Sequence, residues 1–286
     1  MLKTFAVAVL SLLASSVHAA EPNAALVERG KVLMNGVVAC GNCHTPRDEK
    51  GALIGAKTLA GGMLFDDGPI KAYARNITPD PETGIGRWTD AQLKKAIREG
   101  IRPDGSLIGP PMPFEFYRHI ADRDLDAIVA YIRAQPAVKN EVPKSTYAMP
   151  LPKAWGPPVV SVKAPPAGTT VKYGEYLATI AHCMECHTNH DEKGALIRSR
   201  WGAGGFVFNG PWGQSVSRNL TPDASGLKNW TDAQIAKAIR TGTDRNGHPY
   251  RPPMGFDFYK NIGDADMKAL ILYLRSLKPL PSAAKS

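Results

Sequence analysis

The sequence contains only four cysteines in 286 residues, and they form two Cys-x-x-Cys pairs. Because all four belong to these pairs, no thiol is left over for a disulfide. Long apolar runs are also missing: after residue 14 none approaches the roughly 20 residues that a membrane-spanning helix needs. Strand-like alternation is scarce as well, which leaves a mainly α fold as the expectation.

A histidine follows the second cysteine of each pair, so two C-x-x-C-H pentapeptides occupy residues 40–44 and 183–187. This pattern is typical of haem c attachment, in which two thiols bind the haem vinyl groups and the histidine becomes an axial iron ligand. Half of a zinc site and a thioredoxin-like pair are alternatives. The two motifs lie 143 residues apart, however, and neither sits in a βαβ unit. We therefore predict two covalently bound haem c groups, held by Cys40, Cys43, His44, Cys183, Cys186 and His187.

Most of the chain consists of two copies of one sequence repeat, offset by 142 or 143 residues. Arg-Asn-Ile-Thr-Pro-Asp at 75–80 returns at 218–223 with Leu in place of Ile. Pro-Pro-Met at 110–112 returns at 252–254. Repetition at such a spacing indicates a tandem duplication.

The same helices are predicted in each copy. The middle helix opens with Thr and carries Gln three residues later, which is a capping box, and Gly100 or Gly242 marks its end. The last helix has apolar residues at helical spacing and an aspartate, Asp122 or Asp264, as its predicted N-cap. The first helices are expected near Ala24–Met34 and Val171–Ala181, and the middle ones from Thr89 and Thr231.

Proline is concentrated between the two copies, with eight prolines in residues 136–166. Such a segment is extended and fairly stiff. It is either a plain tether, or it wraps over one domain and fixes the angle between the two haems. The second alternative is considered because Tyr147, Met149 and Trp155 would then pack against a domain.

The first residues have the features of a secretory signal: Lys3, an apolar run over 5–14 and small residues before a cut near Ala19. Haem attachment to C-x-x-C-H is completed outside the cytoplasm, so both signals predict an exported, periplasmic protein. The expected organisation is a signal peptide at 1–19, a first domain at 22–137, a proline-rich linker at 138–168 and a second domain at 169–286.

A second axial ligand for each iron is predicted from the repeat. Met112 and Met254 are the methionines that match between the copies, each within Pro-Pro-Met. Two prolines disfavour a helix and present the thioether from a stiff loop. A His/Met pair favours Fe(II), raises the reduction potential and suits one-electron transfer. The other methionines are expected to fill the core, and His119, His182, His190 and His248 are unmatched, with the first, third and fourth expected at the surface or in loops.

Groups around the ligands are harder to predict. An axial histidine usually donates its second N–H to a carbonyl, and Pro46 is placed to offer one in the first copy, where the second has Asn189. Arg75 and Arg218 are candidates to pair with haem propionates. The tryptophans Trp88 and Trp230 either pack near the same haem edge or are buried indoles beside a capped helix.

The net charge of +9 is unevenly distributed. Residues 22–137 hold 15 basic and 14 acidic residues, whereas residues 169–286 hold 15 and 10. No nucleic-acid-binding motif accompanies the basic excess, so no nucleic acid is predicted as a partner. The excess either serves solvation or steers the second domain toward an acidic protein.

Together, the C-x-x-C-H motifs, the Pro-Pro-Met loops and residues 75–89 resemble the diheme class I c-type cytochromes. They are especially similar to the cytochrome c subunits of bacterial membrane-bound alcohol, aldehyde and gluconate dehydrogenases. The resemblance implies two tandem class I cytochrome c domains and a periplasmic dehydrogenase as electron donor. It also implies a cytochrome or terminal oxidase as acceptor, and peripheral membrane association through such a partner. Those subunits commonly carry a third haem, whereas this sequence has two motifs.

Two function classes remain from the sequence. An electron carrier needs both irons closed by protein ligands, and it would not be an enzyme. A diheme peroxidase-type enzyme needs one iron with a displaceable ligand. Because both copies supply a methionine, the sequence favours the carrier.

Overall fold

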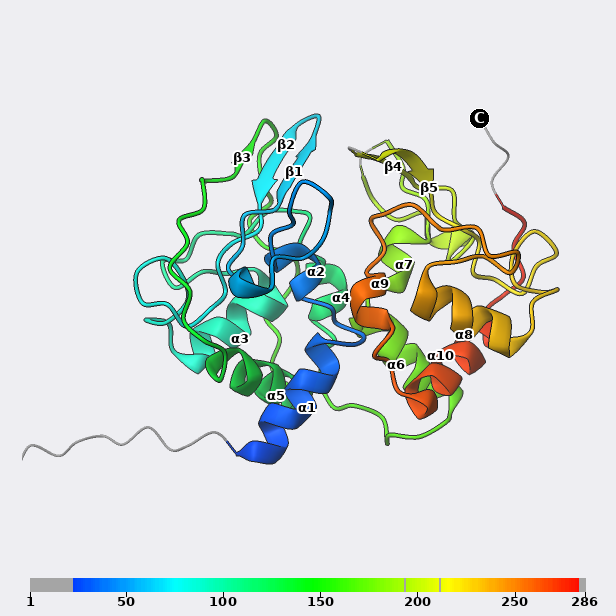
Figure 1. Cartoon of the computed structure of the whole chain (residues 1–286), viewed down its shortest axis with the longest axis horizontal. Coiled ribbons are helices and arrows are strands. Elements are labelled where there is room, and N and C mark those ends of the chain that lie inside the picture. The colour runs from blue at the N-terminus through cyan, green and yellow to red at the C-terminus, as the bar shows by residue number, and fades with distance from the viewer. Residues whose placement is uncertain (1–22, 193, 211, 283–286) are drawn as a thin grey trace, which may run out of the picture.

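The computed structural model describes residues 23–192, 194–210 and 212–282, so the predicted signal peptide lies outside the described residues. Figure 1 shows two similar halves side by side, the first in blue to green and the second in yellow-green to red. In the described part, no helix is both long enough and apolar enough to cross a membrane. The helices of the first half are α1 (Ala24–Met34), α2 (Gly41–His44), η1 (Gly55–Lys57), α3 (Asp90–Glu99), α4 (Phe114–Tyr117) and α5 (Asp122–Arg133). Those of the second are α6 (Val171–Ile180), α7 (Cys183–Cys186), η2 (Arg198–Arg200), α8 (Asp232–Thr241), α9 (Phe256–Tyr259) and α10 (Asp264–Ser276).

The first and last helices of each half cross and form its base (Figure 1). Glycine permits the crossing: a Cβ on Gly30 of α1 would lie 2.0 Å from the Ala127 carbonyl oxygen of α5. Gly174 of α6 has the same relation to Ala269 of α10, at 1.8 Å. Backbone therefore packs directly on backbone, which no larger residue would allow at this separation.

The middle helices are capped as predicted. Thr89 and Thr231 each form a complete capping box with the glutamine three residues on, and Gly100 and Gly242 end the helices in left-handed conformation. The predicted N-caps of the last helices are wrong by one residue. Asp122 and Asp264 are the first helical residues, and the preceding Ala121 and Gly263 take the N-cap position. The aspartate side chains are used for ion pairs with Arg98 and Arg240 instead.

A small β-hairpin stands above each haem motif in the view of Figure 1 and was not predicted. In the first half β1 (Leu64–Asp67) pairs with β2 (Ile70–Tyr73), and in the second β4 (Val207–Gly210) pairs with β5 (Gly213–Val216). The strands have four residues each, too few for alternation to stand out. The first hairpin gains a third strand, β3 (Thr146–Tyr147), from the proline-rich segment.

The proline-rich segment runs along the first half. The Val138 carbonyl accepts hydrogen bonds from Asn76 and Thr78, and Asp122 accepts from Ser161 and the Val162 backbone. Between these ends the segment forms β3. Tyr147 and Trp155 pack against the first half, as expected for a segment that wraps over a domain. Met149 does not, because it is 42% exposed.

The two halves contact each other through buried and charged groups. Tyr176 donates to the Asp124 carboxylate at 2.7 Å, and Arg29 binds the same carboxylate at 2.9 Å. Phe116 stacks on Trp201 with ring centroids 6.3 Å apart. Desolvated contacts of this kind fix the relative position of the halves.

Candidate haem sites

Each C-x-x-C-H motif forms a single helical turn, which is α2 or α7 together with one flanking residue. The residue before the first cysteine, Ala39 or His182, adopts a left-handed conformation with φ of 49° or 43°. Such a backbone is uncommon outside glycine, and its recurrence in both copies shows that the surroundings hold it in place. It turns the chain from the first helix of each half into the motif.

The four thiols are free of disulfides and half-buried. Burial raises the pKa of the Cys40 and Cys183 thiols to about 12 and, with the charge of Glu185, that of Cys43 to about 11. Burial likewise raises the pKa of Cys186. All four side chains line one large cavity, as thiols that bond to an enclosed cofactor must.

The motif histidines are oriented identically. The Nδ1 atoms of His44 and His187 lie 2.7 Å from the backbone carbonyl oxygens of Arg75 and Arg218, respectively. Burial lowers the pKa of both imidazoles, so the rings are neutral. Because a carbonyl only accepts, Nδ1 carries the hydrogen, and Nε2 keeps a lone pair for a metal.

The predicted partner of the first histidine was wrong. The Pro46 carbonyl accepts from Ile54, and its counterpart Asn189 accepts from Ile197, both at 2.9 Å. These bonds close a local loop after each motif. The histidine is instead held by a residue 31 positions away, at the start of the repeated Arg-Asn-x-Thr-Pro-Asp segment.

Met112 and Met254 line the same cavity as the motifs. Each follows two prolines joined by a cis peptide bond and precedes a short helix, α4 or α9. The cavity has a volume of about 1490 Å³ and is continuous between the two halves. The structure thus gathers all eight sequence-predicted site residues around one cavity: Cys40, Cys43, His44, Met112, Cys183, Cys186, His187 and Met254.

The other predicted neighbours behave differently in the two copies. Arg75 donates to the Val142 and Pro143 carbonyls of the proline-rich segment, while the Arg218 guanidinium lies 5.7 Å from the centre of the Tyr250 ring. Both arginines also line the cavity, as do Trp88 and Trp230.

Of the unmatched histidines, His119 and His248 are exposed, as expected. His190 is half-buried and packs on Phe206 with ring centroids 4.3 Å apart. His182 lies edge-on to Tyr117, 3.2 Å from the Glu185 carboxylate. Both rings therefore pack inside the protein rather than projecting from it.

Tyr117 and Tyr259 were missed as site residues, although Phe-x-Phe-Tyr recurs in both copies. Burial, followed by the charges of Cys40, Cys43 and Tyr259, raises the pKa of Tyr117. The pKa of Tyr259 is raised in the same way, by burial and then by Cys183 and Cys186. Both phenols also line the cavity that contains the two motifs.

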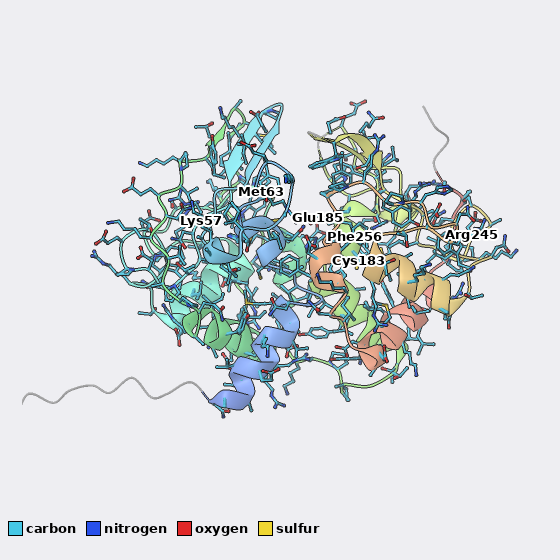
Figure 2. All side chains as sticks on the ribbon, in the orientation of Figure 1. Lys57, Met63, Cys183, Glu185, Arg245 and Phe256 are labelled. Carbon is cyan, nitrogen blue, oxygen red and sulfur yellow. The ribbon has the colours of Figure 1, made fainter. Side chains whose placement is uncertain are left out.

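The motifs themselves face one another across the contact between the halves. Cys43 is close enough to Cys186 to contribute to its raised pKa, after burial, Glu185 and Cys183. Asn42 donates to the Pro253 carbonyl at 3.2 Å, which joins the first motif to the second methionine loop. Figure 2 shows Cys183 and Glu185 near the middle of the molecule, between the halves.

Comparison with known proteins decides what this cavity holds. The sequence profile of the cytochrome c family matches twice, over residues 27–136 and 171–278. The chain belongs to the cytochrome c family. It therefore consists of two tandem cytochrome c domains, mainly α, with two covalently bound haem c groups.

Several relatives of this cytochrome have named roles. The alcohol dehydrogenase (quinone) cytochrome c subunit of Gluconacetobacter polyoxogenes is 31% identical over 97% of this chain and 62% of its own length. The fructose dehydrogenase cytochrome subunit of Gluconobacter japonicus is 29% identical over 97% of this chain and 59% of its own. A diheme cytochrome c-type protein of Cereibacter sphaeroides is 29% identical over 82% and 81%, respectively. The cytochrome thus spans less than two thirds of the two dehydrogenase subunits.

The residues in the cavity fit haem c. Two thiols, one imidazole with a free Nε2 and one thioether converge in each half, and apolar side chains line the space between them. Bare thiols and uncharged rings in an apolar cavity suit a large planar cofactor with apolar faces.

Proposed function

We propose that this cytochrome is a periplasmic carrier of single electrons, which accepts them from a dehydrogenase and passes them to a downstream cytochrome or terminal oxidase. Haem supplies a one-electron Fe(III)/Fe(II) couple when bound. His44 and Met112 would hold its iron in the first domain, and His187 and Met254 would hold it in the second. The names of the relatives, which are cytochrome subunits of dehydrogenases, support a dehydrogenase as donor.

The arrangement of the histidines carries this proposal. The Nδ1 atom of each ring is hydrogen-bonded to a backbone carbonyl at 2.7 Å, which fixes the orientation of the ring. The Nε2 atom of each ring is thereby left to bind a metal. A methionine faces the same cavity in both domains. An iron closed on both faces by protein ligands exchanges electrons and has no position for a substrate.

The contact between the domains supports transfer from one domain to the other. Asn42 of the first motif is hydrogen-bonded to Pro253 of the second methionine loop, and Tyr117 and Tyr259 line the same cavity as both motifs. Electron tunnelling falls steeply with distance, so placing the two attachment sites face to face shortens the path. The hydrogen bonds of Asn42 to Pro253 and of Tyr176 to Asp124 cross between the domains and hold this distance.

The alternative, a diheme peroxidase-type enzyme, differs in one testable property. We expect the purified, exported protein to contain two covalent haems with low-spin iron and the absorption band of methionine-to-Fe(III) charge transfer at both. It should not turn over hydrogen peroxide. A single haem per chain would overturn the diheme proposal, and high-spin iron with rapid peroxide turnover would favour the enzyme.

A further inference from the structure

The carbonyl two residues before each axial methionine is hydrogen-bonded in both domains, but by different means. In the second domain the Ser215 hydroxyl of β5 donates to the Pro252 carbonyl at 2.7 Å. Ser215 corresponds to Ala72 in the first domain, which has no hydroxyl. There the donor is Tyr147 of β3, whose hydroxyl lies 3.1 Å from the Pro110 carbonyl.

Space for Tyr147 is left by a glycine. A Cβ on Gly109 would lie 2.3 Å from Cζ of the Tyr147 ring, so only glycine allows the ring to occupy this place. The counterpart of Gly109 is Arg251. Its guanidinium donates to the Gln214 carbonyl of β5 at 3.2 Å.

A second aromatic of the proline-rich segment repeats this relation. Trp155 stacks on Phe114, with ring centroids 5.7 Å apart, and its indole donates to the Ile108 carbonyl at 2.8 Å. In the second domain Tyr250, the counterpart of Ile108, stacks on Phe256 at 6.3 Å. The bond to the proline carbonyl and the ring stack, which the first domain takes from outside its repeat, are therefore made by residues of the repeat itself in the second domain.

We propose that residues 145–157 act as a strap that positions the Met112 loop against the first haem, with Tyr147 and Trp155 as the positioning residues. The inference rests on the proposed role of Met112 as an axial ligand. The strap binds both sides of the methionine: Tyr147 the carbonyl before it and Trp155 the ring of Phe114 after it. It lies on β2 as strand β3, and Arg75 fixes its approach through the Val142 and Pro143 carbonyls.

A methionine–iron bond competes with opening of the loop that carries the methionine. The Met112 loop has few bonds of its own, since Pro110, Pro111 and Pro113 lack an N–H. Tyr147 and Trp155 supply two hydrogen bonds and an aromatic contact that exist only while the loop is closed. Their loss should raise the population of the open loop and let an outside ligand reach the iron.

Tyr147→Phe tests the strap, because it removes only the hydroxyl. Ser215→Ala is the matched control, since it removes the corresponding bond to the second loop. We expect Tyr147→Phe to tighten imidazole binding to one ferric haem of the two by about fivefold, the size of one net hydrogen bond. Hydrogen exchange should accelerate in the segment 108–114 in this variant, and in 250–256 in Ser215→Ala.

Gly109→Ala provides a second variant that leaves Tyr147 intact but displaces its ring. It should have a larger effect than Tyr147→Phe, and the effect should disappear when Tyr147 is already alanine. If hydrogen exchange and imidazole binding are unchanged in both Tyr147→Phe and Gly109→Ala, the proposal that residues 145–157 position the Met112 loop is wrong. A wild-type protein without methionine ligation would instead overturn the proposed axial role of Met112, whatever the exchange rates show.

Discussion

The two domains of this cytochrome share a haem site but complete it differently. In the second domain, Ser215, Tyr250 and Arg251 of the repeat itself hold the methionine loop. In the first, Gly109 stands in place of Arg251 and leaves room for Tyr147 of the proline-rich segment. Trp155 of the same segment makes the ring contact that Tyr250 makes in the second domain. After a duplication, a segment that joins the copies can take over contacts that one copy has lost. The repeat alone therefore describes the second haem site better than the first.

The largest expected effect concerns the helix crossing that both domains share. Gly30→Ala and Gly174→Ala should each destabilise the protein by about 3 kcal/mol, because the new Cβ would lie within 2.0 Å of a backbone carbonyl oxygen. Thermal unfolding monitored by circular dichroism measures the cost. Gly55→Ala is the control, since a Cβ there meets nothing within 4 Å. A tolerated Gly30→Ala beside a disruptive Gly174→Ala would show that the helix crossings are not equivalent.

The next effect concerns the axial ligands. Met112→His and Met254→His should each lower the reduction potential of one haem, because imidazole favours Fe(III) more than a thioether does. A redox titration followed by visible absorption should then show the wave of the substituted haem at a lower potential and the wave of the other haem unchanged. Covalent haem content should stay at two. If a substitution leaves the titration unchanged, that methionine is not a ligand.

Much of this organisation could be predicted because it is local in sequence. The motifs, the capping boxes and the helices Ala24–Met34 and Val171–Ile180 depend on residues a few positions apart. The partner of His44 was predicted wrongly because the nearest carbonyl, Pro46, is used by its own loop. The hairpins were missed because their strands are short. Whether the proline-rich segment wraps or tethers was left open, because the fit of Tyr147 on Gly109 joins residues 38 positions apart and has no counterpart in the repeat.

A smaller effect is expected from the difference in charge. The second domain has five more basic than acidic residues, and the first has one. If the excess steers an acidic partner, ascorbate, which is an anion, should reduce the second haem severalfold more slowly in 1 M salt than at low ionic strength. The first haem should respond less. The Met112→His protein allows this measurement, because its haems titrate apart. Equal salt dependence at both haems would leave solvation as the role of the charge.

The smallest effect concerns Asp122, which binds the chain just after the strap and whose contribution to stability depends on pH. Hydrogen bonds from Ser161, and then from Arg98, lower the pKa of Asp122. The folded state thus favours the ionised carboxylate, and its contribution to stability is fully present above the ordinary aspartate pKa near 4. It is lost as the pH falls through the lowered value. Asp122→Asn should therefore reduce the melting temperature at pH 7, and the difference from wild type should shrink in acid.

Asp264 is the matched position in the second domain, where Arg240 is a partner at 2.7 Å. Asp264→Asn removes a comparable ion pair but touches no strap. Because the Asp122 side chain is 46% exposed, water screens its ion pair, and the difference between the variants measures mainly the bonds to Ser161 and Val162. Faster hydrogen exchange in residues 145–162 of Asp122→Asn, absent in Asp264→Asn, would show that the strap is fastened at this end. Identical exchange in the two variants would mean that β3 and Trp155 hold it without Asp122.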